Sequence, residues 1–196
     1  MNGGKDMSKI SVFNYVTVDG FFAGPNGETD WFNTIPKNEE WEKFTHGQAQ
    51  SGRSTLVFGR TTYEMMKSYW PTPSALQSDP GMAKVLNESP KIVFSKTLPS
   101  AQEGPRWKNI RVLREIRPDD ILKLKEKEAM MLLGSGSIVR QLASLGLIDE
   151  YNLAVVPVIL GAGKSMFKDV KKTNLKLLEA KSFKNGIVWL SLRAMA

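Results

Sequence analysis

Two short segments combine glycines with hydroxyl or cationic side chains at points where a predicted strand gives way to a predicted helix. In the first, residues 57–64 (VFGRTTYE), Gly59 is followed by Arg60, Thr61 and Thr62. A glycine lets the chain turn sharply off the strand, and the start of the next helix offers unpaired amide groups to an anion. The arginine adds a planar cationic donor group. The segment therefore predicts a phosphate-binding turn. An ordinary helix start with a surface arginine is the alternative.

The second segment, residues 132–139 (LLGSGSIV), holds four small residues in a row: Gly134, Ser135, Gly136 and Ser137. It differs from the G-x-G-x-x-G turn of a Rossmann domain, because Val139 occupies the third glycine position. No acidic residue that could bind a ribose ends a strand about 20 residues further on. Two glycines still let a pyrophosphate approach the backbone, and Ser137 is predicted to cap the helix. A plain tight turn is the alternative.

The side chains of several common catalytic sites are absent from the sequence. There is no cysteine, which excludes disulfides, thiolate metal sites and a cysteine nucleophile. The single histidine, His46, lies near the end of a predicted helix, where it would interact favourably with the helix dipole. One histidine does not make a histidine-rich metal site, and a catalytic triad would need it beside a nucleophile. We therefore predict no metal site.

The chain is basic, with 27 Lys and Arg against 20 Asp and Glu, a net charge of +7. Such a surface could bind a nucleic acid or attract a small polyanion. The densest basic segment, residues 168–176, has no interleaved aromatic residues, and the other cations are dispersed. We therefore expect a phosphorylated small molecule and no nucleic acid. No apolar run approaches the length of a membrane span, and residues 1–10 lack a signal-peptide core, so we expect a cytoplasmic protein.

Strands and helices alternate over most of the chain. Alternating patterns and turn residues predict strands at 10–18, 54–58, 91–94, 110–113, 129–133 and 151–157. Helices are predicted at 38–50, 60–68, 81–88, 118–128 and 138–145, and a proline-rich surface loop at 71–81. A final hairpin, 175–182 with 187–194, turns at Asn185-Gly186. This order predicts a mostly parallel sheet with helices on both faces and antiparallel strands at one edge.

Taken in order, these segments resemble the dihydrofolate-reductase-like superfamily. More closely, the chain resembles the family of the C-terminal reductase domain of the bifunctional riboflavin-biosynthesis deaminase–reductase, the RibD C-terminal domain. The resemblance begins at Ser8 and covers nearly the whole chain. The motifs that carry it are VDGF at 18–21, DW at 30–31, FGRTTYE at 58–64, FSKTL at 94–98, GSGS at 134–137, GLIDE at 146–150 and PVILGAGKSMF at 157–167.

The resemblance implies a three-layer α/β fold with a mixed, mostly parallel sheet of about eight strands. Residues 8–196 would form a single domain after a disordered tail, residues 1–7. The implied cofactor is NADPH, whose additional phosphate suits the basic chain. Its phosphates would contact Gly59, Arg60, Thr61 and Thr62, its 2′-phosphate Ser95 and Lys96, and its pyrophosphate Gly134, Ser135, Gly136, Ser137 and Ile138. Residues 19–31 would form a lid over the nicotinamide.

The implied activity is an NADPH-dependent reduction of a small heterocyclic or ribosyl-aminopyrimidine substrate. Trp31, Gly161, Gly163 and Lys164 would bind that substrate, with Lys164 available to a phosphate. Asp19 and Asp30 are the candidate acids, although each could instead be a turn cap or a loop anchor. Glu39, Glu40 and Glu42 lie near the position of the acid in folate reductases but match it at no single residue. A cofactor-binding regulatory or stress protein without turnover is the alternative function.

The predicted hairpin also suggests an assembly. One face of the hairpin must cover the core, yet both faces carry apolar residues, including Leu175, Leu177 and Leu178. A monomer would expose that second apolar face. We therefore expect a homodimer, because two-fold symmetry is the commonest way to cover such a surface. In the alternative, helices of the same chain cover both faces.

Overall fold

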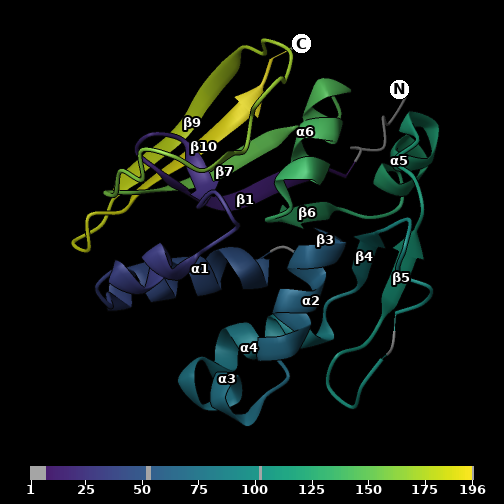
Figure 1. The fold of residues 1–196 in the computed structure, drawn as a ribbon, viewed down its shortest axis with the longest axis horizontal. Helices are drawn as coiled ribbons and strands as arrows, with labels where there is room; N and C mark the ends of the chain where they lie inside the picture. The colour runs from purple at the N-terminus through teal and green to yellow at the C-terminus, as the bar shows by residue number, and fades with distance from the viewer. Residues whose placement is uncertain (1–7, 52–53, 102, 196) are drawn as a thin grey trace, which may run out of the picture.

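One eight-stranded sheet organises the computed structural model, which describes residues 8–51, 54–101 and 103–195 (Figure 1). The predicted tail, residues 1–7, lies outside this part of the chain. From one edge to the other the strands are β5 (Ile110–Leu113), β4 (Lys91–Phe94), β3 (Thr55–Gly59), β6 (Met130–Leu133), β1 (Ile10–Thr17), β7 (Glu150–Val156), β10 (Val188–Ala194) and β9 (Leu175–Ser182). The first six are parallel, and the last two form the antiparallel hairpin. This confirms the predicted sheet.

Helices cover both faces of the sheet, giving three layers. The helices are α1 (Glu39–Ser51), α2 (Arg60–Tyr69), α3 (Pro73–Ser78), α4 (Pro80–Glu88), α5 (Pro118–Lys125) and α6 (Gly136–Ser144). Residues of α5 and α6 pack on one face, and residues of α1, α2 and α4 pack on the other. Two short strands, β2 (Phe21–Ala23) and β8 (Lys164–Ser165), pair outside the main sheet. Among the described residues, no helix is long and apolar enough to cross a bilayer.

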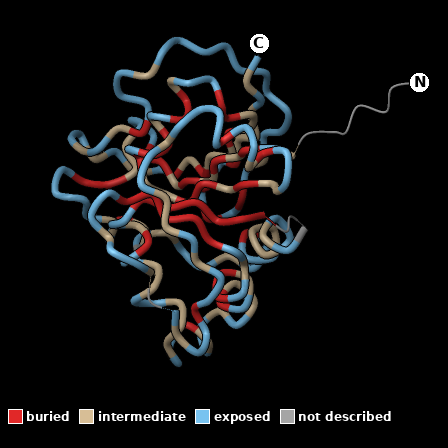
Figure 2. The backbone as a smooth tube through the Cα atoms, turned by 90° about the vertical axis from the view of Figure 1, so that its right-hand side faces the viewer, coloured by how far each residue is buried: buried red, intermediate tan, exposed pale blue. Residues whose placement is uncertain are grey.

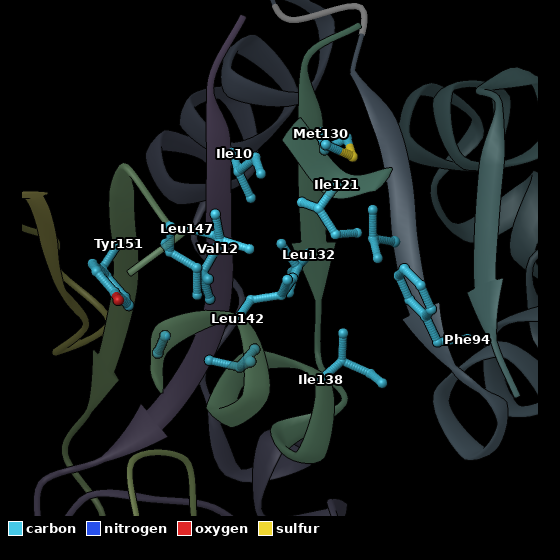
Figure 3. Packing of buried hydrophobic residues seen from close by; sticks show 14 of the residues in the cluster. Ile10, Val12, Phe94, Ile121, Met130, Leu132, Ile138, Leu142, Leu147 and Tyr151 are labelled. Carbon is cyan, nitrogen blue, oxygen red and sulfur yellow. The ribbon is translucent and has the colours of Figure 1, made fainter. Parts of the chain in front are cut away.

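Strand β1 shows why a sequence without polar alternation forms a central strand. Val12 points to one face, where it packs in the same cluster as Leu142 of α6 (Figure 3). Phe13 and Tyr15 point to the other face and pack against the cluster that contains Trp41 of α1. Because both faces are covered, both sets of side chains must be apolar or aromatic. Figure 2 shows the buried residues following these central strands.

The predicted surface loop at residues 71–81 is wrong in part, because the structure forms α3 there and begins α4 at Pro80. Each helix has a proline in its first turn, where the missing amide costs nothing. The Thr72 hydroxyl accepts a hydrogen bond from the Ala75 amide at 3.3 Å, and the Asp79 carboxylate accepts one from the Met82 amide at 2.9 Å. These prolines therefore start helices rather than prevent them.

Candidate cofactor and substrate site

The two glycine-containing turns meet at the carboxyl edge of the sheet. Strands β3 and β6 are parallel neighbours, with Val57 opposite Leu132, so both turns leave the sheet on the same side. The Gly59 amide donates a hydrogen bond to the Ser135 hydroxyl at 2.6 Å. The Ser135 hydroxyl in turn donates to the hydroxyl of Thr62 at 2.8 Å. Ser135 therefore ties one turn to the other.

The second turn is held in an uncommon backbone conformation. Gly134 and Ser135 both have left-handed φ angles, +63° and +59°. Such an angle is uncommon for a residue other than glycine, so Ser135 must be held there by its surroundings. The Ser135 hydroxyl forms the two hydrogen bonds described above. In addition, the Gly134 amide donates a hydrogen bond to the side-chain oxygen of Asn14 at 2.9 Å. The turn is thus fixed from both sides.

Helix α6 begins directly after this turn, and one sequence prediction needs correcting there. Ser135, and not Ser137, occupies the N-cap position, and it forms no side-chain capping bond. The left-handed turn starts the helix at Gly136, so Ser137 lies inside the first turn. The first amides of a helix have no acceptor within the helix, which leaves them available to an anion. Within the described residues, the hydroxyls of Thr61 and Ser137 form no side-chain hydrogen bond.

A cavity of about 1620 Å³ opens beside the two turns. The residues from the sequence prediction that line it are Thr61, Thr62, Gly134, Ser135, Gly136, Ser137, Asp30, Gly163 and Lys164. The predicted residues outside its lining are Gly59, Arg60, Ser95, Lys96, Ile138, Asp19, Trp31 and Gly161. Pockets for one drug-sized ligand are typically about 300–1,000 Å³. This cavity is therefore large enough for two ligands side by side.

The glycines of the second turn leave room for side chains of neighbouring segments. A Cβ atom added at Gly134 would lie 3.0 Å from the Thr62 methyl group, which requires a small residue where the two turns meet. A Cβ added at Gly136 would lie 2.5 Å from the Phe22 ring of β2. Gly136 thus also makes room for a lid residue. The close turns, the free hydroxyls and the helix start fit a pyrophosphate group.

Cationic groups surround the turn that follows β4. The Arg60 guanidinium donates to the Thr97 hydroxyl at 2.8 Å and pairs with Glu64 at 2.7 Å. Ser95 is buried, and its hydroxyl accepts the Leu98 amide at 3.0 Å. Ser95 therefore anchors the turn, while Lys96 is exposed. Thr97 was not among the predicted site residues, because its contact with Arg60 joins the segments that follow two neighbouring parallel strands, β3 and β4.

Part of the predicted lid forms strand β2, which neighbouring segments hold in place. β2 pairs with β8, and a Cβ added at Gly163 would lie 2.5 Å from the Ala23 carbonyl oxygen, so only glycine fits there. The Asp19 carboxylate accepts the amides of Leu160 and Gly161 at 3.1 and 2.8 Å. The Thr17 hydroxyl and these amides lower the pKa of Asp19. Asp19 therefore anchors the loops outside the cavity as an ionised group.

The sequence matches a known protein family and a known relative. A profile of the RibD C-terminal domain matches residues 8–189. The chain belongs to the RibD C-terminal domain family. It is also 32% identical over 174 residues to the uncharacterized protein YyaP of Bacillus subtilis (strain 168), a match that covers 88% of each chain.

Two solved structures share the fold of this RibD C-terminal domain. A protein from Shewanella sp. PV-4 that is assigned to riboflavin biosynthesis superposes with a TM-score of 0.76 at 20% identity, covering 96% of this chain and 99% of that one. Dihydrofolate reductase from Enterococcus faecalis, in complex with NADP(H) and RAB-propyl, superposes with a TM-score of 0.61 at 14% identity, covering 96% and 97%. These likenesses confirm the dihydrofolate-reductase-like fold.

Within this RibD C-terminal domain, the aromatic residues near the lid differ from the sequence prediction. Trp31 is buried and packs edge-on against Phe32, and it is Phe32 that lines the cavity. Tyr15 also lines the cavity, and its hydroxyl accepts the Trp41 indole N–H at 3.2 Å. Burial raises the pKa of Tyr15 above its ordinary value. Tyr15 was missed because, on a strand covered on both faces, an aromatic residue looks like core.

Proposed function

We propose that this protein is an NADPH-dependent reductase that transfers hydride to a small heterocyclic or ribosyl-aminopyrimidine substrate. One observation carries the proposal: two turns tied together by Ser135 open into a cavity large enough for two ligands. The family and the folate-reductase-like fold support the same cofactor class. Ligands of open α/β sheets bind at the carboxyl ends of the strands, which is where these turns lie.

NADPH is favoured over NADH by the groups around the turn after β4. Arg60 and Thr97 already contact each other, and Lys96 extends from the same turn. A phosphate on the adenosine ribose would receive charge-assisted hydrogen bonds from such a cluster. Residues 134–137 would hold the pyrophosphate, and Thr61 would add a hydroxyl. NADH lacks the phosphate that this cluster would bind.

The chain's own part in the reaction is to position groups and to hold a proton. When bound, the nicotinamide supplies the hydride. The Tyr15 hydroxyl is protonated at neutral pH, as for an ordinary tyrosine, and burial raises its pKa further. Because this oxygen accepts from Trp41, its own proton can be donated to a substrate atom. Asp30 lines the same cavity and is the second candidate, and the lid strand β2 would exclude water.

The proposal is tested by titrating the full chain with NADPH and then supplying substrates. We expect saturable NADPH binding, and NADPH oxidation when a reducible aminopyrimidine riboside or dihydropterin is added. The Ser135→Gly variant should weaken NADPH binding, with the exposed-residue variant Ser100→Gly as its control. NADPH binding without oxidation by any compound of the panel would instead support a regulatory cofactor-binding protein. Failure of the wild type to bind NADPH would contradict both functions.

A further inference from the structure

One arm of the cavity has no role in binding the cofactor as proposed above. It is the part of the cavity that helices α1, α2 and α4 line beyond Thr61 and Thr62. Its walls are Ala49 of α1, Met65 and Met66 of α2, and Met82 and Val85 of α4. Leu56 of β3 and Met131 of β6 contribute to the same lining. These seven side chains are apolar, although α1 also contributes the polar residues Glu42, Thr45 and Gln48 to the lining. The methionines can adapt to the shape of a bound group.

The apolar wall of this arm is open to the cavity. Met65 is 47% exposed, and the neighbouring Tyr69 is 45% exposed, although both line the cavity. Exposed apolar side chains gathered in a concave site commonly mark a ligand-binding surface. The arm is therefore shaped to receive a group that water solvates poorly.

One end of the arm is held by a side-chain contact between α1 and the residue that precedes α4. The His46 ring lies 3.0 Å from the Asp79 carboxylate, which joins α1 to the start of α4. The same carboxylate caps α4 by accepting the Met82 amide. These contacts fix the spacing between α1 and α4, so the arm is a built feature.

Charge divides the cavity into two unlike ends. The cations in its lining are Lys37, Arg140, Lys164 and Lys168. Among the described residues, no Lys or Arg of α1, α2 or α4 lines it. A phosphate or carboxylate placed in the arm would be desolvated without a cationic partner. Anionic groups are therefore disfavoured in the arm and favoured near Arg140 of α6, Lys164 of β8, Lys168, and Lys37 before the start of α1.

We propose that the arm between α1, α2 and α4 binds an uncharged apolar or aromatic group carried by the substrate. The inference rests on the proposed reductase function and narrows its substrate class. The substrate would combine a reducible ring near Tyr15 with an apolar extension toward Met82. A compact, wholly polar sugar phosphate would leave this arm unused.

A matched pair of fluorescent probes tests the arm directly. Neutral 1-aminoanthracene and anionic anthracene-1-sulfonate have the same ring system and differ in charge. We expect the wild type to bind the neutral probe more tightly, by roughly tenfold or more. Equal or tighter binding of the sulfonate at this arm would overturn the inference.

Two variants with larger side chains in the arm, called the filled variants, show whether the probe binds there. Ala49→Phe and Val85→Trp would fill the arm from opposite walls, while Gln50→Phe and Lys84→Trp change exposed neighbours outside the lining. Each filled variant should weaken binding of 1-aminoanthracene by roughly tenfold or more, and each control should match the wild type. Melting curves check that every variant is folded. Unchanged probe binding in both filled variants, once they are shown to be folded, would overturn the inference.

NADPH titration of the same variants separates this inference from the proposed function. Both filled variants should bind NADPH as the wild type does, because the turns at residues 59–62 and 134–137 are untouched. Loss of NADPH binding in folded Ala49→Phe would overturn the arm as a separate substrate site. If the wild type binds 1-aminoanthracene at the arm but never binds NADPH, the apolar site is supported and the reductase function is contradicted.

Discussion

At the residue scale, Ser135 is the residue on which the candidate site depends most. Its hydroxyl joins two turns that lie 76 residues apart in the sequence, and its backbone is left-handed. Ser135→Gly keeps that conformation accessible while removing both hydrogen bonds. We expect a loss of about 1–2 kcal/mol in the free energy of unfolding and weaker NADPH binding. Chemical denaturation and titration measure these effects, and unchanged values for both would contradict the role of Ser135.

Tyr15 gives the second prediction at this scale. Tyr15→Phe removes the hydroxyl and keeps the ring, so NADPH binding should be unchanged. The rate of substrate-dependent NADPH oxidation should fall by about 10²-fold, the scale of general acid catalysis. Tyr69→Phe is the matched control, because Tyr69 also lines the cavity but its hydroxyl lies 3.1 Å from that of Ser78. A rate equal to that of the wild type would assign the proton to another group, with Asp30 the first to test.

At the element scale, Lys91 joins β4 to its neighbours. Its ammonium group is buried and donates to the carbonyl oxygens of Asn87, Ser89 and Lys108 at 2.9, 2.7 and 3.2 Å, with the Trp107 ring 4.3 Å away. Burial lowers the pKa of Lys91 from 10.5 to about 8. The end of α4 and the start of β4 are therefore held by one side chain whose pKa is about 8.

This pKa predicts a pH dependence of stability. Between pH 8 and pH 10.5 the unfolded chain keeps the Lys91 proton while the folded chain releases it. Since the unfolded state binds more protons, the free energy of unfolding rises with pH over this window, by up to about 1.4 kcal/mol per pH unit. Lys91→Met should lose this rise. Denaturation of both proteins across the window measures it, and a difference between them that does not change with pH would contradict the prediction.

The elements also show what could be predicted from the sequence. The boundaries of β4, β5 and β9 match their predictions because each is a short run of strand-forming residues between turn residues. The pair β2 and β8 was missed, since strands of three and two residues carry no periodicity and pair across about 140 residues of chain. The short helix η1 (Asp30–Thr34) was also missed, so the sequence could not show that Phe32, rather than Trp31, faces the cavity.

Some features of the candidate site could likewise be predicted from the sequence, and others could not. The turns at 59–62 and 134–137 could be located from glycines after predicted strands, and their proximity follows from parallel pairing. The contacts of Ser135, Ser95 and Asp19 with other loops could not be predicted, because each depends on the packing of distant segments. Sequence position alone therefore indicated which residues gather at the sheet edge. It did not indicate which of these residues hold the loops in place through hydrogen bonds.

At the scale of the whole molecule, the homodimer remains a prediction, and we propose the exposed edge strand β9 as its interface. Leu175, Leu177 and Leu178 are 40%, 54% and 40% exposed. We expect light scattering to give twice the 21.9 kDa mass of one chain. Leu177→Asp should produce the single-chain mass, and Leu122→Asp, at an exposed site on α5, should leave the dimer intact. A wild type with the mass of one chain at micromolar concentration would contradict the assembly.

The central claim is that this fold binds NADPH through the two turns and the cationic groups beside them. Isothermal titration of the wild type and Arg60→Ala with NADPH and NADH tests it most directly, with Lys67→Ala as a control on the same helix. We predict that Arg60→Ala weakens NADPH binding by roughly 1.5–3 kcal/mol, the scale of a lost charge-assisted hydrogen bond, while NADH binding barely changes. An equal loss for both cofactors, or no binding of NADPH to the wild type, would contradict the account.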